Sequence, residues 1–326
     1  MNIKHGYELS DLLLVPQPSL VNSRDNVNLS RSIGTFSLSI PIIASPMKGI
    51  VGTELIKKIG ELGGIGILHR FYSDFAERNR DLDYLADYTG KFGVAVGLND
   101  NFYKEAIEEG ASIICLDVAN GYLDSVVRAT EEIANYIQKR NLPYTCLVMS
   151  GAVATYAGTK LLVAAGANLI RVGIGSGGLC TTRSNTGIGV PQASAIKDCS
   201  YADVSIVADG GIMTSGDAVK ALALGADFLM IGSLFAKTYE SDHDGEIKGM
   251  ASREFQEQFY GEVKKSVEGV QKNVIKDISL ENLIKEFIWN MKSGFTYCNA
   301  INIDYLHRNA EFIVCGTNSI RKDINE

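Results

Sequence analysis

The sequence predicts an α/β protein built as a (β/α)8 barrel, the TIM-barrel fold class, and three observations lead to this prediction. Eight short β-rich segments recur along the 326 residues. Each is a continuous apolar run rather than an alternating one, as expected for a parallel sheet that helices cover. Helical patterns follow most of these runs at regular spacing. A doubly wound open sheet is the main alternative, but eight strand–helix units favour the closed barrel.

The predicted strands are short, and several of them end in polar or glycine-rich sequence. They cover residues 41–47 (PIIASPM), 64–69 (GIGILH), 93–97 (GVAVG), 113–118 (IICLDV), 145–151 (TCLVMSG), 169–175 (LIRVGIG), 205–210 (SIVADG) and 228–233 (FLMIGS). Helices are predicted over residues 53–62, 123–140 and 215–224, where apolar residues recur at helical spacing. Gly110, Gly166 and Gly225 supply the left-handed turn that helix-to-strand loops favour.

We expect one domain over residues 1–326, because no Pro- or Ser-rich linker and no low-complexity tract interrupts the chain. Residues 1–40 are predicted to form an N-terminal arm. The barrel strands follow over residues 41–233. Residues from about 239 to 326 form a C-terminal extension with at least one helix, over 280–291.

The composition is that of a globular protein and narrows the possible functions. There are 38 acidic and 31 basic residues, and the net charge of −7 argues against a generic nucleic-acid binder, which needs a basic face. The sequence has no run of about 18 apolar residues, so no membrane span is expected. The start, MNIKHGYEL, lacks the apolar segment of a secretory signal. The six cysteines form no CxxC pair, so we expect reduced thiols and a cytoplasmic protein.

Chemistry is expected at the C-terminal ends of the strands, where barrel enzymes place their active sites. The loop after the sixth strand, residues 173–192, is the longest and is rich in glycine. Its G-x-G-x-x-G pattern is a weak dinucleotide-binding signal, because residues 181–191 contain too many Gly and polar residues for the helix that must follow. The loop is either a flexible glycine segment or a backbone cradle for an ion, holding Cys180 at the site.

Cys180 is the best candidate nucleophile. A lone cysteine is usually a small buried hydrophobe, and Cys115 and Cys146 lie inside apolar strands as that rule predicts. Cys180 instead lies in a polar loop near Thr182 and Arg183. A cationic neighbour and free backbone N–H groups would favour its thiolate.

Glycine pairs follow the seventh and eighth strands, as Asp209-Gly210-Gly211 and Gly232-Ser233. In barrels these loops commonly bind phosphate, because glycine lets backbone N–H groups approach the oxygens. Each pair is alternatively a tight turn. Asp209 is a candidate to hydrogen-bond sugar hydroxyls, or else a helix N-cap.

Asp117 ends the fourth strand and is followed by Asn120-Gly121. An acid there binds a ribose, orients a base or stabilises the turn. Arg171 lies within the sixth strand, and an arginine inside a barrel needs a charged partner. Asp117 or Asp209 would serve as that partner.

The chain resembles the IMP dehydrogenase and GMP reductase family from about Gly6 to Leu306. The matching sequence comprises SPM (45–47), GGIGILHR (63–70), DVANGY (117–122), RVGIGSGGLCTTR (171–183), GIGVPQASAI (187–196), ADGGI with SGD and KALALGA (208–226), IGSLFA (231–236) and KGM (248–250). The set is long, ordered and specific.

The resemblance implies a (β/α)8 barrel that binds a purine 5′-nucleotide beside a nicotinamide cofactor. Cys180 would attack C2 of the purine and form a covalent thioimidate, and Asp209 would hold the ribose hydroxyls. Gly178, Gly211, Gly232 and Ser233 would surround the phosphate. The other residues implied to bind the nucleotide are Ser45, Met47, Gly249 and Met250.

The resemblance also implies a cofactor site and a cation site. Asp117 would face the cofactor and Lys265 would contact it. The implied cofactor-binding residues are Arg70, Asp117, Asn120, Gly121 and Lys265, and the carbonyls of Gly175, Gly177 and Cys180 would bind a monovalent cation such as K+. The family further suggests a homotetramer.

Within the family, the reductase branch matches better. Only a short segment separates Arg70 from Gly93, so the regulatory insertion of the dehydrogenases is absent, and the C-terminal flap is short and has no Arg-Tyr pair. Reductases pair a Thr, matching Thr182, with a Glu, matching Glu268, for the ammonia step. The resemblance therefore favours reductive deamination of GMP to IMP with NADPH. The alternative is an IMP dehydrogenase that forms XMP with NAD.

Several positions depart from the family pattern. Lys48 stands where the family has Asp, Ala152 replaces Asn, Gly178 replaces a phosphate-binding Ser, Ile247 replaces Tyr, and Val270 stands where reductases have Lys. These changes keep a third interpretation open. The protein would then be a divergent paralogue that acts on a modified purine nucleotide or only binds nucleotide.

Overall fold

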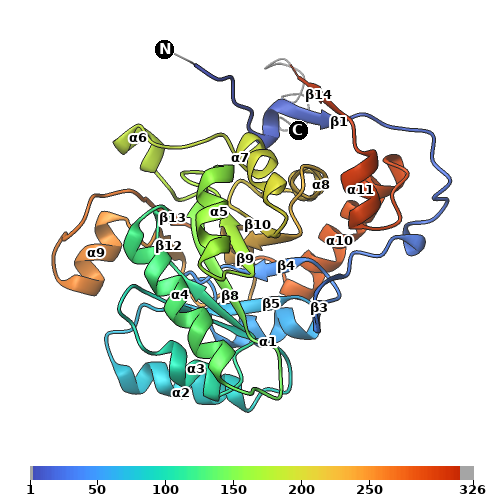
Figure 1. Ribbon diagram of the computed structural model, residues 1–326. Coiled ribbons are helices and arrows are strands. Elements are labelled where there is room, and N and C mark those ends of the chain that lie inside the picture. The colour runs from blue at the N-terminus through green and yellow to red at the C-terminus, as the bar shows by residue number, and fades with distance from the viewer. Residues whose placement is uncertain (1–2, 316–326) are drawn as a thin grey trace.

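The computed structural model describes residues 3–315 and shows a closed barrel of parallel strands surrounded by helices (Figure 1). The strands follow chain order around the barrel, and the last pairs with the first. They are β4 (Ile42–Ala44), β5 (Ile65–Leu68), β6 (Gly93–Val96), β7 (Ile113–Leu116), β8 (Leu147–Val153), β9 (Leu169–Val172), β10 (Ser205–Asp209) and β11 (Phe228–Ile231). The predicted fold class and the eight predicted strands are confirmed, with most of the strands shorter than predicted.

Helices connect successive strands on the outside of the barrel (Figure 1). They are α1 (Thr53–Glu61), α2 (Phe75–Ala86), α3 (Tyr103–Glu108), α4 (Asp124–Lys139), α5 (Tyr156–Ala164), α7 (Gln192–Cys199) and α8 (Ser215–Ala223). The start of α8 shows why the sequence forms a helix there: Thr214 and Asp217 form a capping box, each side chain accepting the other's backbone N–H. Gly225, which follows α8, has φ +114°, as its predicted turn requires.

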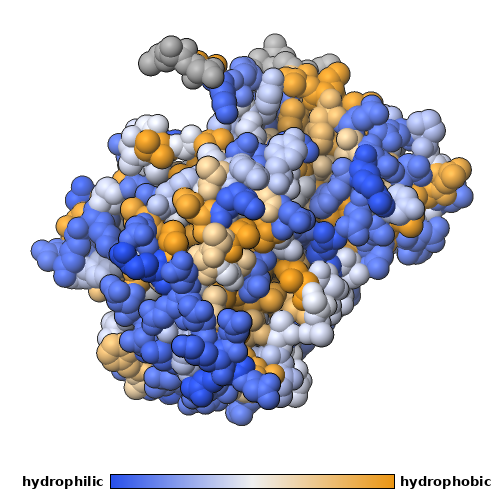
Figure 2. Space-filling view, viewed as in Figure 1, coloured by the Kyte–Doolittle hydropathy of each residue, from blue (hydrophilic) through white to orange (hydrophobic). Residues whose placement is uncertain are grey.

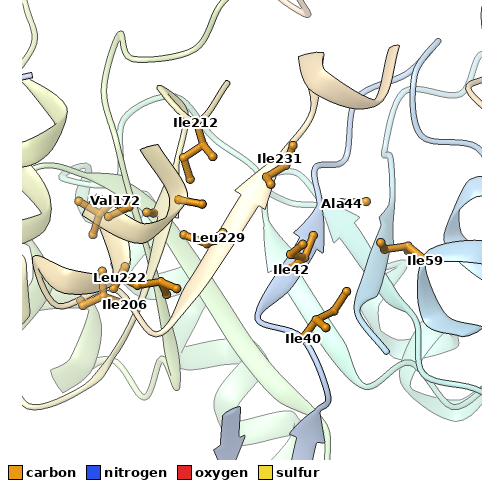
Figure 3. Packing of buried hydrophobic residues seen from close by; sticks show 14 of the residues in the cluster. Ile40, Ile42, Ala44, Ile59, Val172, Ile206, Ile212, Leu222, Leu229 and Ile231 are labelled. Atoms are coloured by element: carbon orange, nitrogen blue, oxygen red, sulfur yellow. The ribbon is translucent and has the colours of Figure 1, made fainter. Parts of the chain in front are cut away.

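Side chains from the strands fill two buried clusters. Ile43 and Phe228 belong to the cluster inside the barrel. Ile42 and Leu229, which neighbour them in the sequence, pack on the outer side with helix residues such as Ile59 (Figure 3). Full burial of such a side chain contributes about 1.5–3 kcal/mol. Both faces of the sheet are therefore packed, which explains the continuous apolar runs.

The N-terminal arm contacts both the inside of the barrel and a C-terminal strand. It contains η1 (Leu9–Asp11), β1 (Leu12–Leu14), η2 (Arg24–Asn26), β2 (Arg31–Ile33) and β3 (Phe36–Leu38). The β2–β3 hairpin contributes Phe36 to the cluster inside the barrel. β1 pairs antiparallel with β14 (Phe312–Val314), so a segment near the start of the chain lies beside one near its end (top of Figure 1).

The paired strands β1 and β14 carry apolar side chains on the surface. Figure 2 shows hydrophobic residues gathered over these strands. Leu13, Ile313 and Val314 are 43%, 56% and 55% exposed, whereas Leu12 is buried. Leu13 and Ile313 pair across the sheet and turn their shared face to solvent, whereas the opposite face buries Leu12 but leaves its partner Val314 exposed.

The C-terminal extension contains β12 (Glu246–Lys248), α9 (Arg253–Tyr260), β13 (Gln271–Asn273), α10 (Leu280–Tyr297) and α11 (Ile303–Asn309). We call residues 246–273 the flap. The predicted helix over 280–291 is confirmed but is longer than expected. α10 continues because Phe295 is buried and Gly294 lies against Val219 of α8, where a Cβ would come within 3.1 Å of Val219 Cγ2. That contact between helices is not visible in the sequence.

Residues 181–191, which the sequence argues against as the helix of a dinucleotide-binding motif, contain only the five-residue helix α6 (Thr182–Thr186). Its single turn is stabilised because the hydroxyls of Ser184 and Thr186 donate to the carbonyls of Thr181 and Thr182. The helix ends at Gly187, which has φ +72°.

Two findings bear on the organisation of the chain. Within residues 3–315, no helix is long and apolar enough to cross a membrane. The prediction of a single domain over 1–326 includes residues 316–326, which lie outside the described residues, and it stays a prediction.

Candidate active site

A cavity of about 400 Å³ opens at the C-terminal ends of the barrel strands. Such a volume is within the usual range for small-molecule sites. Ten of the residues predicted for the site line this cavity. They are Ser45, Met47, Arg70, Asp117, Gly175, Cys180, Thr182, Asp209, Met250 and Lys265. Parallel strands bring these residues together because all their C-terminal ends meet at one end of the barrel.

Cys180 lies exposed in the loop after β9, and the flap supports that loop. Cys180 and Gly269 form an isolated antiparallel bridge. The N–H of Thr181 donates to the carbonyl of Glu268 at 2.9 Å, and that of Val270 donates to Leu179 at 3.1 Å. The flap therefore fixes the backbone on both sides of the thiol.

Cys180, Thr182 and Glu268 form a hydrogen-bonded chain. The Thr182 hydroxyl donates to Glu268 Oε2 at 2.6 Å, and Cys180 Sγ lies 3.1 Å from Thr182 Oγ1. Because the single hydroxyl proton is used toward Glu268, the thiol proton is the one available for the sulfur–oxygen contact. Ser266 donates to the other carboxylate oxygen of Glu268. The arrangement offers a path for a proton from the thiol to the carboxylate.

Arg183 does not lie against the thiol, so the expected cationic neighbour of Cys180 is a wrong prediction. Its guanidinium pairs with Glu8 of the N-terminal arm and donates to the carbonyl of Val190 at 2.7 Å. Glu8 also accepts the N–H of Gln192 at 2.8 Å. A carboxylate distant in the sequence thus attracts the guanidinium and joins the N-terminal arm to the loop over residues 173–192, which carries Cys180.

Three charged residues that line the cavity, Arg171, Asp117 and Asp209, form what we call its charged floor, and Arg171 is buried. Arg171 donates to Asp209 Oδ2 at 2.8 Å and to Asp117 Oδ1 at 3.0 Å, so both predicted partners are used. Burial opposes its charge, but Asp209 and the other acceptors outweigh this and hold the pKa of Arg171 well above its usual value. Arg70 Nε donates to Asp117 Oδ2 at 3.2 Å. Burial raises the pKa of the nearby Cys115 thiol to about 12, so that thiol stays protonated.

The residues predicted for the phosphate lie in or near the loop that carries Cys180. A Cβ on Gly178 would be 3.5 Å from Ser233 Oγ, so these two residues are neighbours. Gly232 lies against Met47 and Ser45, and Gly211 borders a smaller cavity behind the loop. The backbone N–H groups of the four predicted phosphate residues donate to no other residue between 3 and 315.

Three other predicted site residues are also not among those that line the cavity, and the structure shows only their local contacts. Gly249 packs against Gly269 and Leu179, where a Cβ would come within 3.3 Å of the Gly269 Cα. Gly121 donates its N–H to the Ala152 carbonyl. The Asn120 side chain accepts the N–H of Tyr122 in a local turn. Their roles toward substrate or cofactor stay predictions.

The positions that depart from the family pattern have distinct surroundings. Ala152 lines the cavity, and Ile247 is buried in the flap. Lys48 donates to the Phe71 carbonyl at 2.9 Å and lies 5.5 Å from the Tyr72 ring centroid. Val270 is exposed and directly precedes β13.

Lys48 also influences its neighbour His69. Burial is the main cause that lowers the pKa of His69 to about 3, and the positive charge of Lys48 adds to it. His69 is therefore neutral at physiological pH. The neutral ring accepts the N–H of Phe71 at 3.3 Å.

The sequence missed Gln256, which lines the cavity from α9. Its Oε1 accepts the N–H groups of Lys264 and Lys265 at 3.1 and 2.8 Å, and the residue is buried. Gln256 adjoins Phe255 on the buried face of α9, a helix that was not predicted from the sequence. Ser266 was missed as well, and an exposed serine gives no signal in the sequence.

Comparison with known proteins identifies relatives that match nearly the whole chain. Residues 6–324 match the family model described as "IMP dehydrogenase / GMP reductase domain". The chain is 34% identical to human GMP reductase 2, covering 94% of this chain and 93% of the relative. It is 32% identical to the GMP reductase of Oceanobacillus iheyensis, covering 96% of both. It is 30% identical to the inosine-5′-monophosphate dehydrogenase of Cryptosporidium parvum, covering 98% of this chain and 95% of the relative.

Proposed function

Because the chain belongs to the IMP dehydrogenase/GMP reductase family, we propose that it is a GMP reductase that converts GMP to IMP and ammonia with NADPH. The family is one of nicotinamide-dependent oxidoreductases that act on purine nucleotides. The single observation that carries the choice of reductase is the hydrogen-bonded chain from Cys180 through Thr182 to Glu268. This chain supplies both the nucleophile and the proton that release of ammonia needs.

The first step would use the thiol and the carboxylate together. As Cys180 Sγ bonds to C2 of GMP, its proton passes through Thr182 to Glu268. Glu268 then returns that proton to the amino group, the C2–N bond breaks and ammonia leaves. Splitting the exchange into two steps around a covalent thioimidate lowers each barrier, and positioned proton transfer contributes about 10²–10⁴-fold.

The cofactor fits the chemistry of the residues beside the thiol. Arg70 and Lys265 line the cavity, and their positive charges match the pyrophosphate of a nicotinamide dinucleotide. When bound there, the cofactor would supply the hydride that reduces C2. Cys180 would take back the electron pair of the C–S bond as IMP is released. Asp117, held by Arg70 and Arg171, would orient the cofactor.

Asp209 is suited to hold the ribose of the nucleotide. Its Oδ2 is occupied by Arg171, while Oδ1 accepts no hydrogen bond from residues 3–315. The remaining nucleotide contacts would come from Ser45, Met47, Gly178, Gly211, Gly232, Ser233, Gly249 and Met250. We assign the carbonyls of Gly175, Gly177 and Cys180 to a potassium ion, since neutral carbonyl oxygens suit this cation.

We also propose a cytoplasmic homotetramer in which residues 1–326 form one domain. A reducing compartment would keep the Cys180 thiol available for catalysis. Light scattering of the purified protein tests the tetramer, and a dependence of turnover on K+ tests the cation.

The test of the proposed function is two reactions run side by side. With GMP and NADPH, near-ultraviolet absorbance of the reduced cofactor should fall. A rise of that absorbance with IMP and NAD instead would assign the dehydrogenase reaction. Absence of both changes, with GMP still raising the melting temperature, would favour a protein that binds nucleotide or acts on a modified one.

A further inference from the structure

Lys272 lies on the flap, and its ammonium group reaches the loop that carries Cys180. Nζ donates to the carbonyl of Gly178 at 3.0 Å. The residue is on β13, which lies with β12 and α9 at one side of the barrel (left in Figure 1). Lys272 pairs with Ile247 of β12 in the two-stranded sheet of the flap. The flap thus places a positive charge beside the catalytic loop.

This ammonium has no carboxylate partner in the part of the chain that the structure describes. The ion pairs formed inside the flap join Arg253 to Glu257 and Lys264 to Glu262, and none includes Lys272. The side chain is exposed, so little desolvation opposes binding of an anion. Its one hydrogen bond to a neutral carbonyl leaves two N–H donors free.

The surroundings of Gly178 are those expected for a phosphate. Gly178 neighbours Ser233, and the N–H groups of both residues donate to nothing else within residues 3–315. These donors are neutral, and so are those of Gly211 and Gly232. The predicted phosphate residues therefore supply hydrogen bonds but no positive charge.

We propose that Lys272 binds the 5′-phosphate of the purine nucleotide, an inference that rests on the proposed function. A monophosphate carries close to two negative charges at pH 7, and a charge-assisted hydrogen bond is stronger than a neutral one. Gly178 and Ile247, the two residues beside Lys272, have no side-chain donor. Lys272 supplies the charge that these neighbours lack. A change of its rotamer moves Nζ from the Gly178 carbonyl to the phosphate.

The test compares ligands with and without the phosphate. Isothermal titration calorimetry gives the dissociation constants of GMP and guanosine for the full-length wild type, Lys272→Met, Lys272→Arg and the control Lys264→Met. Lys264 is an exposed flap lysine that pairs with Glu262. Methionine keeps the length of the side chain and removes the charge, and circular dichroism checks that each variant is folded.

The expected result is selective. Lys272→Met should weaken GMP binding about tenfold, the order of one charged hydrogen bond, and leave guanosine binding unchanged. Lys272→Arg should retain most of the GMP affinity, and Lys264→Met should match the wild type. An equal loss for GMP and guanosine, or no loss for GMP, overturns the role of Lys272 alone. If GMP does not bind the wild type, the proposed function fails, and this inference fails with it.

Discussion

Replacing Arg171 with methionine tests how the charged floor of the cavity is held. Arg171 is the buried bridge between Asp117 and Asp209, with contacts of 3.0 and 2.8 Å. Its removal leaves two carboxylates facing each other without compensation. Breaking a buried ion pair costs about 3–5 kcal/mol. Since the carboxylate side chains are 18% and 20% exposed, we expect the lower end, about 3 kcal/mol.

Chemical denaturation monitored by circular dichroism measures this loss of unfolding free energy. Arg128→Met is the matched control, because Arg128 pairs with Asp124 on the exposed face of α4; it should leave the unfolding free energy unchanged. Adding Asp117→Asn to Arg171→Met should recover part of the stability by relieving the repulsion with Asp209. If Arg171→Met were as stable as the Arg128 control, the account of the cavity floor would be refuted.

Four further changes test the catalytic loop. Cys180→Ala should abolish turnover while GMP still binds, as calorimetry would show; unchanged turnover would exclude it as nucleophile. Thr182→Val should lower kcat about 10²-fold with little change in KM, because it breaks the proton path; wild-type kcat would contradict that path. Glu8→Gln should lower kcat because it releases Arg183, and Glu8→Asp should keep a higher kcat because it retains the charge. Equal kcat in the two variants would show that the charge of Glu8 does not position the loop through Arg183. Iodoacetamide at pH 8 should label the exposed Cys180 and spare Cys115, whose burial raises its pKa and keeps it protonated. Peptide mass spectrometry measures the labelling, and a labelled Cys115 beside an unlabelled Cys180 would contradict this prediction.

The sequence predicts the barrel well because its signals are local. Ile42, Ile43 and their counterparts form runs that only a sheet packed on both faces explains. Once the strands are known, the topology itself brings Asp117, Cys180 and Asp209 to one end of the barrel. The partners of Arg171 followed from the same reasoning, since a buried charge must be compensated.

What the sequence could not predict depends on contacts between distant segments. Arg183 lies in the same loop as Cys180, three residues further along, yet Glu8 from the N-terminal arm determines where its guanidinium lies. The length of α10 depends on its packing against α8 at Gly294. The position of Lys272 depends on the register of the flap hairpin, which sequence periodicity over three residues cannot fix.

A crystal structure of the protein with GMP bound tests the central claim most directly. The account predicts C2 of the purine within about 3.5 Å of Cys180 Sγ, or covalently joined to it, with Glu268 and Thr182 on the side of the amino group. A base bound with C2 far from Sγ, while the thiol points away into the protein, would contradict it.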